Sequence, residues 1–120
     1  MATTSTDAQP MQEWLVIAPD VEGKLEERMR VRSQHFSDMM PQVDSGLWVD
    51  GGALLDHPQK SPSSALPING SFLIGRASTR EEIVERLKAD VYTQAGVWDW
   101  GRVQVIPVSA ELSYCMYEVS

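Results

Sequence analysis

One stretch, residues 25–43, constrains the fold most, because it places basic side chains among apolar ones at helical spacing. Apolar residues recur at every third or fourth position, as on one face of an amphipathic helix. They are Leu25, Met29, Phe36, Met39 or Met40, and Val43. Arg32 lies inside this stripe, and Arg28 and His35 lie on adjoining turns. Because a buried cation needs a partner, the helix either pairs these groups with other elements or forms a pocket wall.

Length and charge limit what the chain can do. Its 120 residues are enough for one domain. The net charge of −7 argues against nucleic-acid binding, which needs a concentrated basic surface, although arginines that converge locally could bind a small anion. No apolar run reaches the roughly 18 residues of a membrane span, and we see no secretory signal. The single Cys115 fits a reducing compartment, so we expect a cytoplasmic protein without a membrane partner.

Hydrophobic periodicity divides the chain into strands and helices between two polar or irregular ends. Residues 1–12 are small and polar and are expected to be a disordered lead. Strands are predicted at 13–18, 47–55, 68–75 and 102–108, with a loop at 56–67 that is either mobile or a lid. The first helix is predicted over 24–40, ending or continuing past Pro41 with a break or kink there, and with a C-terminal cap at Gly46. The second begins with a Thr79–Glu82 capping box and extends to Val91. Residues 109–120 form a tail expected to dock on a surface.

The predicted order of elements is β-α-β-β-α-β over residues 13–108. It indicates an α+β, ferredoxin-like unit with two helices on one face of a four-stranded antiparallel sheet. The second face of that sheet would be left bare and apolar. A bare apolar face on a small domain favours association, most simply as a homodimer.

Several motifs occur in an order and spacing typical of a known family. They are the strand from Trp14 to Asp20, the helix Leu25-Glu-Glu-Arg-x-x-Val-Arg-x-x-His35, the segment Gly46-Leu-Trp-Val-Asp-Gly-Gly52, Asn69-Gly-Ser71, and Asp90-Val-Tyr-x-x-Ala-Gly-Val97. Over residues 13–108 the chain resembles the YciI-like, or YCII-related, family. The resemblance implies a dimeric α+β barrel with a pocket between helices and sheet. It also implies enzymes that act on small ring compounds without metal or cofactor, by elimination or isomerisation.

The same resemblance implies a catalytic histidine and aspartate, which correspond here to His35 and Asp90. Val91 stands where the family has the proline of an Asp-Pro-Tyr turn. Histidine side chains can take up and release a proton near neutral pH, and a carboxylate can hold the ring in one tautomer. The alternative is a structural histidine that is hydrogen-bonded at a helix edge.

Arg28 and Arg32 could bind a carboxylate, phenolate or enolate and stabilise developing negative charge. The alternative is ion pairing with a nearby acid, for which the candidates are Glu26, Glu27, Glu82 and Glu85. We favour pairing for Arg28 and the site for Arg32, which lies in the apolar stripe.

Further candidates are glycines, aromatic residues and aspartates elsewhere in the chain. Gly51 and Gly52 could let a ligand approach the backbone, or form a plain β-bulge. The aromatic side chains could line a pocket or pack in the core or dimer: Trp48, Phe72, Tyr92, Trp98 and Trp100. Asp44 and Asp50 are possible site carboxylates. The two histidines, His35 and His57, show no metal-ligand spacing, so no metal site is expected.

These observations predict a cofactor-independent lyase or isomerase in a catabolic or secondary-metabolite pathway. Its substrate would be a small hydroxylated or carbonyl-bearing ring compound. The alternative is a non-catalytic dimer that binds a small molecule or serves as an accessory protein.

Overall fold

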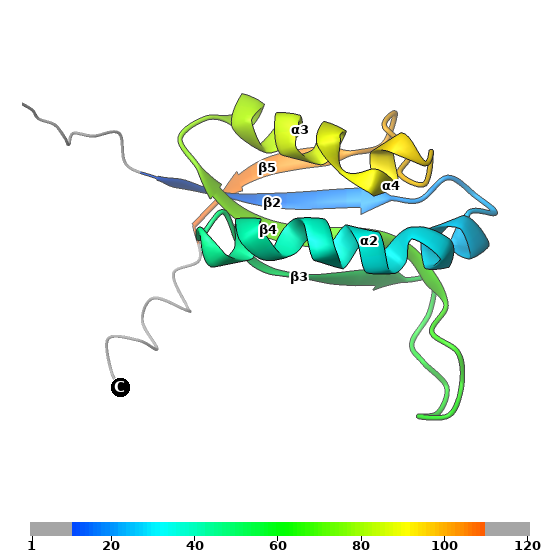
Figure 1. Cartoon of the computed structure of the whole chain (residues 1–120). Helices are drawn as coiled ribbons and strands as arrows, with labels where there is room; N and C mark the ends of the chain where they lie inside the picture. Colours follow the sequence, from blue (N-terminus) through cyan, green and yellow to red (C-terminus); the bar gives the residue numbers. More distant parts are fainter. Residues whose placement is uncertain (1–10, 110–120) are drawn as a thin grey trace, which may run out of the picture.

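The computed structural model describes residues 11–109 (Figure 1). The predicted disordered lead (residues 1–12) and the predicted tail (residues 109–120, with Cys115) therefore lie outside the described residues, apart from residues 11, 12 and 109. The elements, in chain order, are β2 (Gln12–Pro19), α2 (Leu25–Asp44), β3 (Trp48–Leu55), β4 (Ile68–Ala77), α3 (Arg80–Ala89), α4 (Val91–Gln94) and β5 (Gln104–Val108).

The four strands form one antiparallel sheet with the order β3-β4-β2-β5. Both long helices lie on one side of it, with α2 running along β4 and β3 and α3 nearer to β2 and β5 (Figure 1). The predicted α+β architecture is therefore confirmed. Because β2 and β4 are neighbours at the centre, segments far apart in sequence meet beneath α2.

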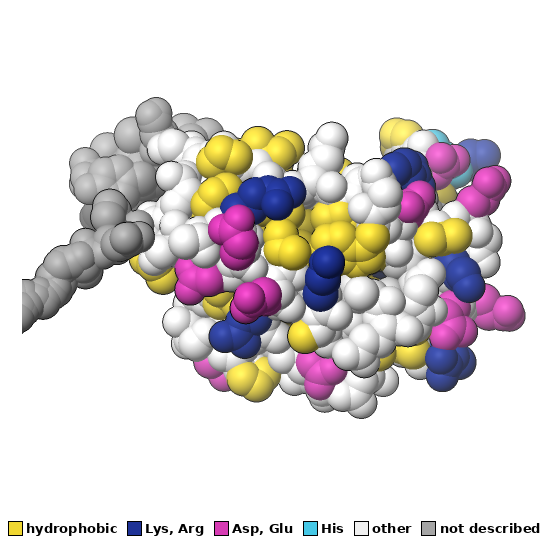
Figure 2. Space-filling view, turned by 90° about the horizontal axis from the view of Figure 1, so that it is seen from above, with side chains coloured by type: hydrophobic (Ala, Val, Ile, Leu, Met, Phe, Trp, Pro, Cys, Tyr) yellow, Lys and Arg dark blue, Asp and Glu magenta, His cyan; other side chains and the backbone are white. Residues whose placement is uncertain are grey.

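The face of the sheet away from the helices carries an apolar row. Side chains alternate between faces along a strand, and Leu15 of β2 is paired with Ile74 of β4 on one side and Ile106 of β5 on the other. Leu15 and Ile74 are only partly buried, and Ile106 is 39% exposed. Figure 2 shows a different side of the molecule, seen from above the view of Figure 1, where hydrophobic groups gather in the middle with basic and acidic side chains around them.

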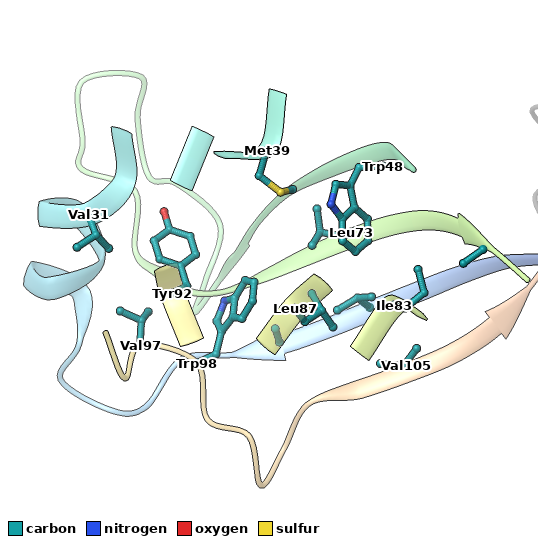
Figure 3. Packing of buried hydrophobic residues seen from close by; sticks show 13 residues of the cluster. Val31, Met39, Trp48, Leu73, Ile83, Leu87, Tyr92, Val97, Trp98 and Val105 are labelled. Carbon is teal, nitrogen blue, oxygen red and sulfur yellow. The ribbon is translucent and has the colours of Figure 1, made fainter. Parts of the chain in front are cut away.

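The helix-facing side of the sheet supplies the core (Figure 3). Val16 and Ala18 alternate with the outward residues of β2 and are completely buried. Val16 pairs with Leu73 of β4 and Val105 of β5, so one row of side chains crosses three strands. Ile83 and Leu87 of α3 close over this row with 0% and 1% exposure.

The first helix continues past Pro41 to Asp44, so the predicted break does not occur. Pro41 is exposed, so water can satisfy the carbonyl that loses its usual donor. The last turn is also held from outside: the Trp48 indole Nε1 donates to Gln42 Oε1 at 3.0 Å, and the Leu47 N–H donates to the Gln42 carbonyl. Gly46 follows with φ 87°, which confirms the predicted C-terminal cap.

The second helix is shorter than predicted. The Thr79–Glu82 capping box is present, but α3 ends at Ala89 rather than Val91. Asp90 is extended, with φ −71° and ψ 146°, and its carboxylate accepts a hydrogen bond from the Tyr92 N–H at 2.8 Å. Asp90 therefore ends one helix and caps the N-terminus of the next, because its side chain satisfies a free N–H of α4.

The last strand begins at Gln104 rather than Arg102. Arg102 is held by other partners, since its guanidinium donates to Asp99 Oδ2 and to the Asp20 carbonyl, each at 2.9 Å.

The 56–67 connection between β3 and β4 projects from the body of the molecule (Figure 1). Its base is closed by a hydrogen bond from the Asp56 N–H to the Pro67 carbonyl, and the Gln59 amide donates to the Ser64 carbonyl within it.

Candidate active site

A cavity of about 480 Å³ lies between α2 and the strands β3 and β4. Its wall includes six of the predicted site residues, and the seventh, Asp90, lies outside it: the six are Arg28, Arg32, His35, Trp48, Gly51 and Gly52. Apolar groups form most of the remaining lining, including Phe36, Met40 and Leu66. The volume matches small-molecule sites, which are usually apolar with a few polar groups.

The stripe of α2 that faces the sheet is not the apolar one predicted. The buried residues are Arg28, Val31, His35 and Met39, whereas Leu25, Met29, Phe36, Met40 and Val43 are 43% to 52% exposed. The helix is therefore rotated so that two of its basic groups point inward. This rotation is possible because buried carboxylates from other elements meet them, and it leaves apolar side chains around the cavity.

His35 and Asp90 lie 55 residues apart in sequence and meet beneath α2. His35 Nδ1 is 2.9 Å from Asp90 Oδ1, and both residues are buried, with 6% and 8% exposure. Asp90 Oδ1 also accepts the Tyr92 N–H, so the cap of α4 and the contact with His35 share one oxygen. An ionised Asp90 favours a proton on Nδ1 and leaves Nε2 as the ring's second position for chemistry.

The other ring nitrogen of His35 is open. His35 Nε2 has no hydrogen bond to the described part of the chain. Within residues 11–109, the side-chain nitrogen or oxygen that is both shielded from solvent and without a hydrogen bond is Asp20 Oδ2. His35 Nε2 is therefore not shielded, and it is reachable from the cavity that His35 lines. A nitrogen of this kind can exchange a proton with a bound compound.

Aromatic rings hold the imidazole in place. Tyr92 stacks on it at a centroid distance of 4.0 Å and an interplanar angle of 19°. Trp98 lies edge-on to both rings, at 6.2 Å from His35 and 5.5 Å from Tyr92. The histidine is thus fixed from several sides, as a proton-transfer group needs to be.

Arg28 lines the cavity, but its guanidinium is bonded to a buried network of the chain itself. Its guanidinium donates to Asp20 Oδ1 at 2.8 Å and to Ser71 Oγ at 2.6 Å, and the Trp98 indole donates to the same Ser71 Oγ at 3.1 Å. Pairing was predicted for Arg28, but the partner is Asp20 and not a glutamate of either helix. Burial raises the pKa of Asp20, and the positive charge of Arg28 opposes that rise.

Sequence reasoning missed Asp20 and Ser71 as partners of Arg28. Each is a polar residue at the end of a motif: Asp20 closes the Trp14–Asp20 segment, and Ser71 closes Asn69–Ser71. The signal was there, since a polar residue that ends or interrupts a buried strand needs a partner. Which arginine it would meet depends on how α2 is rotated above the sheet.

Arg32 is exposed at the cavity, with its guanidinium 4.8 Å from the centre of the Phe36 ring. It has no ion pair within residues 11–109. The neighbouring Arg30, in contrast, pairs with Glu27 on the helix surface. Arg32 is therefore a positive charge that is free to meet a ligand.

The two glycines line the cavity, and side chains from β4 lie close against them. A Cβ on Gly51 would come within 2.6 Å of Leu73 Cδ2, and one on Gly52 within 2.8 Å of Phe72 Cε1. The irregularity in strand pairing lies just before them, between Trp48 and Asp50. Both glycines thus permit a close approach, and the groups that approach belong to the chain itself.

Three other candidates differ in position. Trp48 is buried, lines the cavity, and uses its indole N–H in the bond to Gln42. Asp50 lies at the cavity, where its carboxylate accepts the Gly51 N–H at 2.8 Å. Asp44, at the end of α2, is not part of the cavity wall. In the part of the chain that the structure describes, no three His, Cys, Asp or Glu side chains cluster as metal ligands would.

Comparison with known proteins identifies the class that this fold and site define. The model of the YCII-related domain matches residues 12–109, and the chain belongs to that family. This confirms the resemblance drawn from the motifs.

Individual relatives come from fungal biosynthesis. Fusaric acid biosynthesis protein 2 of Gibberella moniliformis is 33% identical over 104 residues, which is 87% of this chain and 99% of that protein. Aspercryptin biosynthesis cluster protein B of Emericella nidulans is 31% identical over 97 residues, covering 80% of this chain and 62% of the other. The chain is thus similar to proteins of secondary-metabolite biosynthesis.

A solved structure shares the fold. It is TftG of Burkholderia phenoliruptrix AC1100, a 5-chloro-2-hydroxyhydroquinone dehydrochlorinase in complex with 2,5-dihydroxybenzoquinone. The TM-score is 0.68 with 22% identity, over 81% of this chain and 93% of TftG.

No helix within residues 11–109 has the length and apolar character to span a membrane.

Proposed function

We propose that this protein is a lyase or isomerase that acts without a cofactor on a small hydroxylated or carbonyl-bearing ring compound. The observation that carries the proposal is the His35 Nδ1–Asp90 Oδ1 contact of 2.9 Å, with the imidazole at the wall of a ligand-sized cavity. A histidine buried only for packing would not need an open ring nitrogen beside that cavity.

In the proposed reaction, His35 Nε2 removes a proton from a carbon next to a carbonyl group of the ring. The electron pair of that C–H bond moves toward the carbonyl oxygen and forms an enolate. Asp90 stabilises the imidazolium that results, and Arg32 offers a positive charge to the enolate. The reaction ends when the proton returns at another carbon, an isomerisation, or when a leaving group departs, an elimination.

Two similarities support this reading. The fungal relatives are named for biosynthesis of secondary metabolites, so we place the protein in such a pathway. TftG, which shares the fold, is a dehydrochlorinase of 5-chloro-2-hydroxyhydroquinone, and its structure is a complex with 2,5-dihydroxybenzoquinone. A hydroxylated six-membered ring is therefore the first compound class to test.

The test begins with a strain that makes this protein and one that lacks it. The compound that accumulates without the protein is the candidate substrate, and purified protein should convert it. His35→Asn should slow this conversion by roughly 10²- to 10⁴-fold, the usual contribution of a general acid or base. The matched control is His57→Asn, which alters the exposed loop histidine whose Nδ1 contacts the Pro58 carbonyl and should act like wild type.

Binding of 2,5-dihydroxybenzoquinone, followed by tryptophan fluorescence or calorimetry, gives a second readout. If the folded His35→Asn protein converts the accumulated compound at the wild-type rate, His35 is not the acid or base. If wild-type protein binds the accumulated compound and never converts it, the chain is a non-catalytic binding or accessory protein.

We also propose a homodimer formed through the open face of the sheet. The apolar row of Leu15, Ile74 and Ile106 supports this, because an exposed apolar row on a small domain is stabilised by a second copy. Ile74→Asp should convert the dimer to a monomer in analytical ultracentrifugation. The control Met29→Asp alters an equally apolar but helical surface, and should leave the association unchanged.

A further inference from the structure

The Tyr92 ring is fixed by several contacts, although the reaction above gives Tyr92 no role. It is 1% exposed and belongs to α4, directly after the Asp90 cap. Its ring stacks on His35 at 4.0 Å, and the Arg28 guanidinium lies 4.5 Å from its centroid. With Trp98 edge-on at 5.5 Å, the ring has one orientation.

The hydroxyl at the end of this fixed ring has no partner in the chain. It forms no hydrogen bond within residues 11–109. It is not sealed either, because Asp20 Oδ2 is the sealed, unpartnered side-chain atom of the described residues. Tyr92 lines the cavity, and Figure 3 shows its oxygen pointing away from Val97 and Trp98. The hydroxyl is therefore directed into the ligand space.

Two arginines and two carboxylates lie near this phenol. Burial raises the pKa of Tyr92; the positive charges of Arg28 and Arg32 oppose the rise, and the carboxylates of Asp90 and Asp20 add to it. The phenol is thus protonated at neutral pH and can donate a hydrogen bond. Since Arg28 is already bound to Asp20 and Ser71, Arg32 is the cation left to neutralise a ligand charge at the same place.

We propose that the Tyr92 hydroxyl binds the ligand directly, donating a hydrogen bond to an anionic oxygen on its ring, a phenolate or enolate. Arg32 supplies the opposite charge, so the site selects ring compounds with an acidic oxygen over neutral ones. Such charge-assisted hydrogen bonds are about twice as strong as neutral ones. The inference rests on the proposed function and names the residue that holds the substrate oxygen while His35 moves the proton.

The probe is 4-nitrophenol, whose ionised form has its own visible absorption band. A site that prefers the anion lowers the apparent pKa of the bound probe, and a titration of full-length protein with excess protein over probe measures it. Tyr92→Phe keeps the ring and its stacking and removes only the hydroxyl. We expect it to bind the phenolate roughly ten-fold more weakly, which raises the apparent pKa of bound nitrophenol by about one unit.

Arg32→Gln should weaken phenolate binding in the same direction, while Arg30→Gln removes a nearby arginine outside the cavity and should not. Benzoate tests whether the anionic oxygen must be attached directly to the ring or can belong to a carboxylate. If Tyr92 reads an oxygen on the ring itself, benzoate should compete poorly with the phenolate, and its weak binding should be insensitive to Tyr92→Phe.

Three results would overturn the inference: a folded Tyr92→Phe protein that lowers the pKa of the bound probe as wild type does, a wild type that binds neither form of nitrophenol, or a benzoate affinity that depends on Tyr92 as strongly as phenolate affinity. These outcomes are distinct from failure of the proposed function. Unchanged phenolate selectivity in Tyr92→Phe, with His35→Asn still inactive, removes only the role of Tyr92. Full conversion by His35→Asn removes the proposed function whatever Tyr92 does.

Discussion

Arg28 and His35 lie two turns apart on α2, and each reaches a buried carboxylate from another part of the chain. The Arg28–Asp20 pair, at 2.8 Å, extends into the fold: Arg28 also donates to Ser71, which accepts from Trp98 as well, while Asp20 Oδ2 is buried without a partner within residues 11–109. The His35–Asp90 pair, at 2.9 Å, has a ring nitrogen left open beside the cavity. Two contacts with nearly the same length and burial therefore suit different tasks, one structural and one chemical.

The two basic groups differ in how their nitrogens are used. Both terminal nitrogens of the Arg28 guanidinium are already bonded inside the fold, to Asp20 and Ser71. An imidazole has two nitrogens, so one can be fixed by Asp90 while the other stays available. Changes around Arg28 should therefore affect stability, and changes around His35 should affect activity.

The largest effect is expected from Arg28→Leu. This change leaves Asp20 buried without its cation, and removing one partner of a buried ion pair costs about 3–5 kcal/mol. Urea denaturation should show that loss of unfolding free energy. Arg30→Leu is the control, since Arg30 pairs with Glu27 on the exposed surface of the same helix and should unfold close to the wild-type midpoint. Equal midpoints for the two variants would contradict a structural role for the Arg28 pair.

A smaller loss of stability is expected from Ser71→Ala. The Ser71 hydroxyl accepts from Arg28 and from the Trp98 indole, so its removal leaves buried donors unpaired, at about 1–3 kcal/mol. Ser33→Ala on the exposed side of α2 is the matched control. The conversion rate of the remaining folded protein should stay near wild type. A large fall in that rate would place the Arg28 network in the chemistry after all.

Asp90 tests the other pair, because two replacements separate its two tasks. Asp90→Asn keeps an oxygen for the Tyr92 N–H but loses the negative charge beside His35, so we expect a roughly ten-fold slower reaction with nearly unchanged stability. Asp90→Ala also loses the helix cap and should lower the unfolding free energy by about 1 kcal/mol. Steady-state kinetics and denaturation measure the two effects. An Asp90→Asn protein of full activity would reduce Asp90 to a helix cap.

The smallest effect concerns pH, and it comes from the aromatic ring between the two pairs. Burial raises the pKa of Tyr92 above the ordinary 10.0, so the unfolded chain loses this proton at a lower pH than the folded protein. The resulting stability is fully present below pH 10 and is lost as pH rises from there through the folded pKa. Wild type should therefore lose more stability above pH 10 than Tyr92→Phe does. Parallel pH profiles would show that the Tyr92 phenol titrates alike in both states.

Local sequence signals predicted the fold well, since its elements are specified by nearby residues. Alternation in β2, the Thr79–Glu82 capping box and Gly46 each act within a few positions. The errors occurred where tertiary contacts outweigh local preference. Pro41 stays inside α2 because the last turn is tied to Leu47 and Trp48. The buried stripe of α2 differs from its apolar stripe because the carboxylates of Asp20 and Asp90 lie beneath the helix and pair with Arg28 and His35.

The sequence by itself determined the order of elements, the family, and the presence of basic groups on one helix, because spacing and residue type are enough for these. Only the tertiary structure decided which basic group does what. Arg28 finds Asp20, eight positions earlier, and Ser71, 43 positions later, while His35 finds Asp90, 55 positions later. These partners depend on how α2 is rotated over the sheet, and that rotation is set by all the buried contacts at once.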